Sequence, residues 1–234
     1  MTSDQSTARP LPTTSLRKTS LIAGLLYLLT FVSIPTLALY GSVHDPNYLV
    51  GPGSTSPVLV GGVLEVIVAL AGVGTAVVLY SVVKRQNEAA ALGLVASRTL
   101  EGAGILAGVA CLLAVVGLRQ AEAGTGALVT GQTLVILYDR IFLLSQSLMP
   151  IVNDLLLGYL LYKSRLVPRV LPWLAFIGAA LLLVSDAAVL FGVVDRVSAL
   201  PALAALPVAL FEFSLGVYLT VKGFKPSPIT AGMV

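Results

Sequence analysis

The stretch "SQSLMPIVNDLLLGYLLYKSRLVP", Ser145 to Pro168, decides the fold because a long apolar run in it ends at basic residues, as a membrane span does. Most positions from Leu148 to Tyr162 are apolar, and the residues "KSR" follow directly. A helix of about 20 apolar residues spans the hydrocarbon core of a bilayer. Asn153 and Asp154 lie inside this run, so the stretch predicts a membrane-spanning helix that carries an amide and a carboxylate.

The composition extends this prediction to the whole chain. Of 234 residues, 57% are hydrophobic and only 11% are charged, whereas about a quarter of the residues in a soluble domain are charged. Such a chain cannot cover itself with a polar surface, so lipid is its expected solvent. We therefore predict an all-α, polytopic membrane protein with six transmembrane helices. The predicted spans are Ser20 to Tyr40, Val58 to Val83, Leu92 to Gly117, Tyr138 to Tyr162, Val170 to Phe191 and Ala199 to Val221.

Short loops predict a single membrane domain over residues 17–225. Residues 1–16 mix Ser, Thr and Pro with few apolar side chains, which predicts a disordered tail, and residues 226–234 are expected to form a second tail. The first span follows 19 residues and lacks an A-x-A-like site, so we expect it to remain as an anchor rather than to be cleaved as a signal peptide.

Basic residues predict the orientation. If the chain starts in the cytoplasm, ten basic residues flank the spans on that side, against Arg119 and Arg196 on the other. The positive-inside rule then places both termini, and both tails, in the cytoplasm. Tyr40 and Tyr138 are expected in an aromatic belt at the outer interface. The ten cytoplasmic residues are Arg9, Arg17, Lys18, Lys84, Arg85, Lys163, Arg165, Arg169, Lys222 and Lys225.

One apolar region is too long for a simple span. Ala127 to Tyr162 is 36 residues, roughly 54 Å as a helix, against a core of about 30 Å. Either residues 124–137 form an amphipathic helix on the outer surface, or the fourth span is long and tilted. We expect Asp139 and Arg140 to mark the interface.

Charged side chains within the spans supply the chemistry. Each costs roughly 2.5 to 3.5 kcal/mol near a span centre, so these side chains should face the bundle interior. The alternating direction of the spans predicts an inner and an outer polar layer. In the inner layer three acids meet one guanidinium, so at least one acid lacks a cation and is a candidate for exchanging a proton. The predicted intramembrane site is Arg98, Glu101, Asn153, Asp154 and Glu212, and the predicted outer layer is Glu65, Asp186, Asp139 and Arg140.

Spacing predicts how these groups pair. Arg98 and Glu101 form an i,i+3 pair on the same helix face as Gly104 and Gly108, and this face should pack against helices. Asp154 and Glu212 have no basic partner nearby in the sequence, and Arg98 is the expected partner of Asp154 across helices. Two interpretations stay open: the polar layers couple transport, or they only fix helix register.

Few residues are suited to metal or cofactor chemistry. The single histidine, His44, lies in the first outer loop, and the single cysteine, Cys111, lies within the third span. We therefore expect no metal and no cofactor. No cluster of basic residues is dense enough to predict nucleic-acid binding. The expected partners are membrane lipids and a small solute, proton or ion, and homo-oligomerisation stays open.

Several stretches resemble the domain of unknown function 4386 family of bacterial membrane proteins. They are "RKTSLIAGLLYLLTF" from Arg17, "LEVIVALAGVGTAVVLYSVVKRQNEAAALGLVASRTLEGAGIL" from Leu64, "LGYLLYKSRLVPRVLPWLAFIGA" from Leu157 and "LFEFSLGVYLTVKGFKP" from Leu210. The resemblance covers about residues 15–228. It implies a multi-pass protein of the bacterial cytoplasmic membrane with no established activity, and the similar segments include Glu65, Arg98, Glu101 and Glu212.

Two functional hypotheses follow from the buried charges. The first is a small transporter or proton-coupled permease, in which Asp154 and Glu212 couple and Arg98 with Glu101 forms an inner gate. The alternative is a non-transporting sensor, accessory or lipid-binding module whose polar core is structural. An intramembrane enzyme that acts on a lipid ranks last, because the sequence has no catalytic motif, metal set or nucleophile for it. A cleft that connects Arg98, Glu101, Asp154 and Glu212 would favour transport or ligand binding.

Overall fold

The computed structural model describes residues 15–231, and within this range it contains helices and no strands. Six helical segments are long and apolar enough to cross a membrane, as the sequence predicts. The predicted disordered tail covers residues 1–16, of which residues 1–14 lie outside the described residues; Ser15 and Leu16 already belong to the first helix, so the tail is shorter than predicted. The main helices are α1 (Ser15–Thr30), α2 (Thr36–Leu39), α3 (Ser56–Val83), α4 (Glu88–Gln120), α5 (Leu128–Phe142), α6 (Leu148–Ser164), α7 (Val170–Leu190) and α8 (Ala199–Val221).

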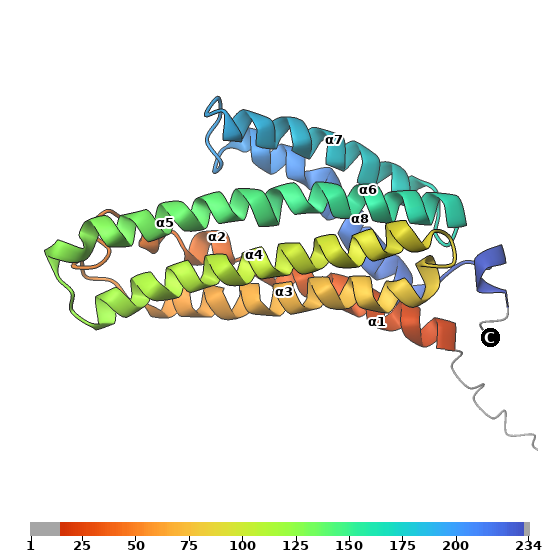
Figure 1. Ribbon diagram of the computed structural model, residues 1–234, viewed down its shortest axis with the longest axis horizontal. Coiled ribbons are helices and arrows are strands. Elements are labelled where there is room, and N and C mark those ends of the chain that lie inside the picture. The colour runs from red at the N-terminus through yellow and green to blue at the C-terminus, as the bar shows by residue number, and fades with distance from the viewer. Residues whose placement is uncertain (1–14, 232–234) are drawn as a thin grey trace, which may run out of the picture.

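The helices form two inclined groups. α3, α4 and the collinear α5 and α6 run side by side, and the α7–α8 hairpin leans against them (Figure 1). α1 packs on both α3 and α8, and α6 packs on both α4 and α7, so these two helices join the groups. The ends of the described chain lie at the same end of the bundle (Figure 1), as an even number of spans requires. The assignment of that end to the cytoplasm stays a prediction.

Local sequence signals explain where helices begin and end. The side chain of Asn87 accepts a hydrogen bond of 3.0 Å from the backbone N–H of Ala90 and so caps the start of α4. Arg165 adopts a left-handed conformation at φ 57° and ends α6. After α8, Lys225 donates its backbone N–H to the carbonyl of Leu166. The predicted C-terminal tail therefore packs on the bundle as far as residue 231, and a 3₁₀ turn, Pro228–Thr230, forms there.

The overlong fourth segment is one helix of 40 residues, Thr125–Ser164. It does not lie along the surface; α5 packs on α4, and the two extend together beyond the α7–α8 hairpin (Figure 1). Residues 124–137 therefore do not form a separate surface helix, and how much of the long helix lies in lipid stays a prediction. Between α5 and α6 the helix widens into a π-helical segment, Leu143–Ser147. Pro150 lies three residues after this segment. Because it lacks an N–H, it cannot bond to the carbonyl of Gln146, which fits the wider turn.

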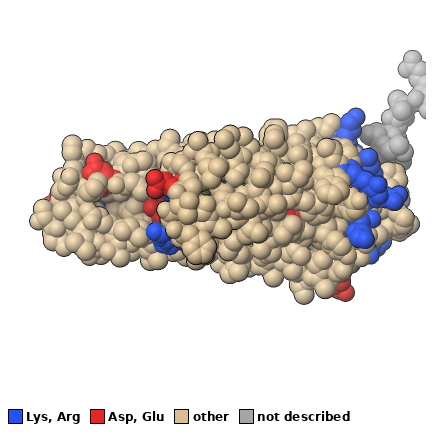
Figure 2. Space-filling model, turned by 90° about the horizontal axis from the view of Figure 1, so that it is seen from above, with Lys and Arg blue, Asp and Glu red and all other residues tan. Residues whose placement is uncertain are grey.

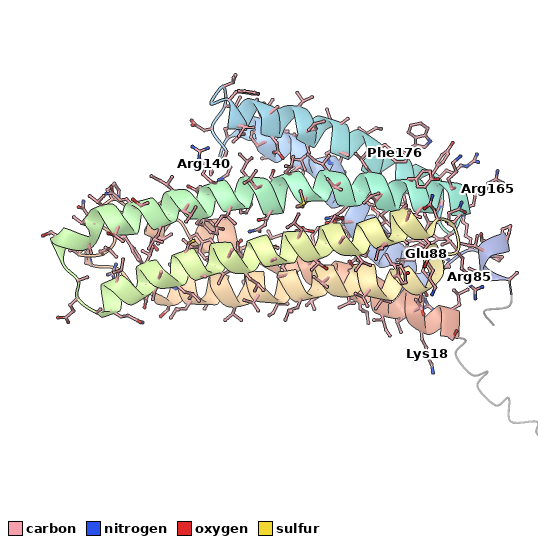
Figure 3. The ribbon with its side chains drawn as sticks, in the orientation of Figure 1. Lys18, Arg85, Glu88, Arg140, Arg165 and Phe176 are labelled. Carbon is pink, nitrogen blue, oxygen red and sulfur yellow. The ribbon has the colours of Figure 1, made fainter. Side chains whose placement is uncertain are left out.

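The charge distribution marks a band that suits a bilayer. Lys and Arg gather at the end that carries the termini, and the surface next to them is almost free of charged side chains (Figure 2). Lys18, Arg85 and Arg165 lie at that end, whereas Arg140 lies where the α7–α8 hairpin turns (Figure 3). Arg140 and Arg165 are 25 residues apart in one helix, roughly 37 Å at 1.5 Å per residue. This length matches a hydrocarbon core of about 30 Å with its interfaces.

Candidate functional site: a charged cleft within the bundle

Arg98 of α4 is the centre of the inner polar cluster. It is buried, with 4% of its surface exposed, and its Nη1 donates a hydrogen bond of 3.0 Å to Oε2 of Glu101. The predicted i,i+3 pair is therefore present. Its Nη2 donates to Oε1 of Glu212 on α8. The ring of Tyr27 on α1 lies 5.7 Å from the guanidinium carbon, so three helices meet at this side chain.

A hydrogen-bonded chain continues from Glu101 to α6. Nδ2 of Asn153 donates to Oε2 of Glu101 at 2.7 Å, and Oγ of Ser97 donates to Oδ1 of Asn153 at 2.5 Å. Both the nitrogen and the oxygen of the Asn153 amide thus form hydrogen bonds, and the residue is 1% exposed. This chain ties α4 to α6 in the same layer in which Arg98 ties α4 to α8.

Asp154 corrects the predicted pairing. Arg98 bonds to Glu101 and Glu212 rather than to Asp154, so the expected ion pair between Arg98 and Asp154 is wrong. Asp154 is fully buried, and neither of its carboxylate oxygens has a hydrogen-bond partner among residues 15–231. Sequence spacing could not settle this pairing, because it depends on which helix faces Arg98.

The predicted outer layer divides into separate contacts. Glu65 on α3 is fully buried; Oη of Tyr138 donates to its Oε1 at 2.9 Å and Nε2 of Gln146 donates to the same oxygen at 3.4 Å. Oγ of Ser147 donates to Oδ1 of Asp186 on α7 at 2.6 Å. Gln146 and Ser147 both belong to the π-helical segment, so this irregular turn points two polar side chains at two different helices.

Asp139 pairs across the cleft rather than along its own helix. Nη2 of Arg196 donates to Oδ1 of Asp139 at 2.6 Å, and Nε2 of His44 lies 3.3 Å from the same oxygen. Arg140 is exposed and takes part in neither of these contacts. The hydrogen bond to the Asp139 carboxylate raises the pKa of His44 above its ordinary value, although partial burial opposes the shift.

Tyr40 and Tyr138 do not form the predicted outer belt. Both are buried, at 3% and 2% exposure, and their rings pack edge to face with 5.5 Å between centroids. They belong instead to a core that fills the extension of α3, α4 and α5 beyond the hairpin.

A cleft of about 1230 Å³ runs between the two helix groups. It extends from the loop residues His44 and Asp195 at the end away from the termini to a floor formed by Arg98, Glu101 and Glu212. Asp186 and Asp139 lie along its wall. Glu65, Asn153 and Asp154 do not line it. The structure therefore brings the inner layer together, but the cleft reaches only part of it.

Several residues of the inner polar cluster and of the cleft could not be recognised from the sequence. Ser97, Ser147 and Tyr27 are ordinary residues within apolar runs, and His44 and Arg196 belong to separate loops. A polar residue in a span is a weak signal by itself. Only the approach of the helices shows that these side chains share a layer.

Fold and cleft together define a polytopic helical membrane protein with a charged cavity between its helices. The chain belongs to the family described as Domain of unknown function (DUF4386), which matches residues 22–223. No curated protein and no solved structure matches the chain. The family membership agrees with the resemblance found in the sequence and adds no activity to it.

Proposed function

We propose that the chain is a small transporter whose cargo enters the cleft and whose Arg98, Glu101 and Glu212 form an inner gate. The observation that carries this proposal is the depth of the cleft, which opens at the end away from the termini and stops at these three side chains. Below them a buried apolar core, with Phe211 and Leu215, closes the path to the other end. This arrangement is the one expected for the outward-open half of an alternating-access cycle.

The packing of α8 supports the proposal that this helix moves during transport. The five buried residues of α8 all lie between Val208 and Leu219, whereas its first half is partly exposed. Among the other long helices α8 packs mainly on α7 and α1, and the contact between Glu212 and Arg98 fastens it to α4. Breaking this contact would free the α7–α8 hairpin to tilt and open the cleft toward the opposite end. Asp154, buried beside the floor with no hydrogen-bond partner among residues 15–231, is the carboxyl that would take up and release a proton during the cycle.

Cysteine accessibility tests this proposal without knowledge of the cargo. In a chain that carries Cys111→Ser, Ala205→Cys places a thiol on the cleft wall, and Ile177→Cys places one on α7 outside the cleft. A membrane-impermeant maleimide should label Ala205→Cys from the side away from the termini. Added Glu212→Gln should allow labelling from the terminal side as well, while Ile177→Cys should react poorly from both sides.

A second function is favoured by the rim of the cleft. Ile34 and Leu37 line the cleft but are 72% and 61% exposed, so its side faces lipid. A non-transporting module that holds a lipid chain there would show labelling of Ala205→Cys from one side only, with or without Glu212→Gln. That result, together with the absence of proton flux in liposomes loaded with a pH-sensitive dye, would overturn the transporter proposal.

A further inference from the structure

The charges that line the cleft do not balance. Arg98 is shared by Glu101 and Glu212, and the bases at the outer end both face Asp139. Asp186 is the buried acid on the wall that faces no basic side chain among residues 15–231. The acids on the wall are Glu101, Asp139, Asp186, Asp195 and Glu212, against the bases Arg98, Arg196 and His44.

Asp186 is held in place, but one of its oxygens is unused. It is 5% exposed, and Leu182 and Val189 line the cleft on the same face of α7, four residues before it and three after it. Its Oδ1 accepts the hydrogen bond from Ser147, whereas its Oδ2 has no partner in the described chain. A buried carboxylate with a free oxygen is costly unless a positive charge or a donor reaches it.

Aromatic rings also line the cleft. Phe142 on α5 lies on the wall, and the guanidinium of Arg196 stands 4.7 Å from the centre of its ring. The ring face of Phe142 thus already binds a cation in this structure. Tyr138 and Tyr40 line the same outer part of the cleft. A positively charged ligand would find an acid on one wall and aromatic side chains on another.

The remaining wall is apolar and large. Ile105, Leu182 and Val208 lie between the floor and the outer charges, and the volume of about 1230 Å³ exceeds that of most pockets that hold drug-sized ligands, roughly 300 to 1,000 Å³. A small inorganic cation would leave this surface unfilled.

From these observations we infer that the cleft binds lipophilic organic cations, with the positive charge at Asp186 and the apolar body along α7 and α8. The inference rests on the proposed function in that it names the class of cargo for the same cleft. The polar wall groups then select charge, and the apolar wall selects size and hydrophobicity.

Two ions of the same shape and opposite charge test the inference. Binding of radiolabelled tetraphenylphosphonium and tetraphenylborate is measured on the purified chain in phosphatidylcholine nanodiscs, with protein-free nanodiscs as background. Asp186→Asn keeps the acceptor for Ser147 and removes the charge, so it should weaken phosphonium binding at least tenfold and leave tetraphenylborate binding unchanged or stronger. Glu122→Gln, the same change of charge on an exposed residue outside the cleft, should change neither.

Leu182→Trp narrows the apolar wall and should weaken binding of both ions. If Asp186→Asn fails to fold, two measurements still test the inference. They are the effect of Leu182→Trp and the preference of the unmodified chain for the phosphonium over the borate. Equal binding of the two ions, or an equal loss of both in Asp186→Asn, overturns the cation inference. Cation binding that depends on Asp186, combined with one-sided labelling of Ala205→Cys, would retain the site and refute transport instead.

Discussion

Asn153 and Asp154 are neighbours on α6, yet their surroundings are opposite. Asn153 bonds to Glu101 and to Ser97, whereas Asp154 bonds to nothing among the described residues. Both are almost fully buried. Asn153 therefore has the structural role, because removing a buried hydrogen-bond partner leaves a donor or acceptor of its neighbours unsatisfied.

Replacing each of these residues by leucine, which has a similar volume, separates the two roles. Asn153→Leu removes the amide donor to Glu101 and the acceptor for Ser97, and it should lower the free energy of unfolding by about 1 to 3 kcal/mol. Asp154→Leu removes a carboxyl that no partner stabilises and should leave the melting temperature in detergent unchanged or raised. A large loss of stability in Asp154→Leu would show that this residue has a structural partner after all.

His44 contributes a stability that depends on pH. Its Nδ1 lies 2.8 Å from the carbonyl oxygen of Tyr40 and its Nε2 lies 3.3 Å from Asp139. Both neighbours are acceptors, so both ring nitrogens can donate only when the imidazole is protonated. The raised pKa in the folded chain means that this stability is complete below the unfolded value of about 6.5 and disappears as the pH rises through the folded value.

The change that tests this is His44→Gln. Between pH of about 6 and about 9, which brackets the unfolded value of about 6.5, the melting temperature of the unmodified chain in detergent should fall more than that of His44→Gln. The difference should be small, because the side chain of His44 is 36% exposed and solvent weakens such pairs. Asp139 keeps its bond to Arg196 in the variant, so the outer wall stays in place. Parallel pH curves for the two chains would exclude a contribution from His44.

At the scale of the element, the close crossing of α4 and the π-helical segment positions the polar side chains. Gly104 lies opposite Ser145, with no room for a Cβ between them, and Gly108 lies against the ring of Tyr138. The predicted glycine face therefore packs against a helix, as expected from its spacing. The π-helical turn itself could not be predicted, because no residue pattern distinguishes it from an ordinary turn before Pro150.

Two glycines of α4 allow a matched test of this crossing. A Cβ at Gly104 would meet Ser145, so Gly104→Ala should destabilise the fold by about 1 to 3 kcal/mol through overpacking. Gly117 on the same helix has no heavy atom within 4 Å of such a Cβ, and Gly117→Ala should be neutral or stabilising by up to about 1 kcal/mol. Thermal unfolding in detergent measures both. Equal changes in stability for Gly104→Ala and Gly117→Ala would mean that α4 and the π-helical segment can move apart without loss of stability.

At the scale of the molecule, composition and apolar length predict the class of fold, because each span must satisfy its own backbone in lipid. Six spans, the pair of Arg98 with Glu101 and the inward direction of the other acids within the helices follow from such local rules. Local rules do not predict which residue of α8 pairs with Arg98, which residues contact Asp139, or that a cleft forms. These features depend on the tilt of the α7–α8 hairpin. Two side chains 114 residues apart, Arg98 and Glu212, meet only once that tilt is set.

The orientation of the molecule is the remaining prediction at this scale. Nine described basic residues lie at the end that carries the termini, from Arg17 on α1 to Lys225 after α8, so this end should face the cytoplasm. Green fluorescent protein fused after Val234 should fluoresce, and alkaline phosphatase fused within residues 51–54 should be active, because the two reporters work on opposite sides of a bacterial membrane. Changing Lys163, Arg165 and Arg169 to glutamine together should reduce both signals, since it removes the basic stop between α6 and α7. The opposite pattern in the unmodified chain would turn the cleft toward the cytoplasm, and cargo would then enter it from inside the cell.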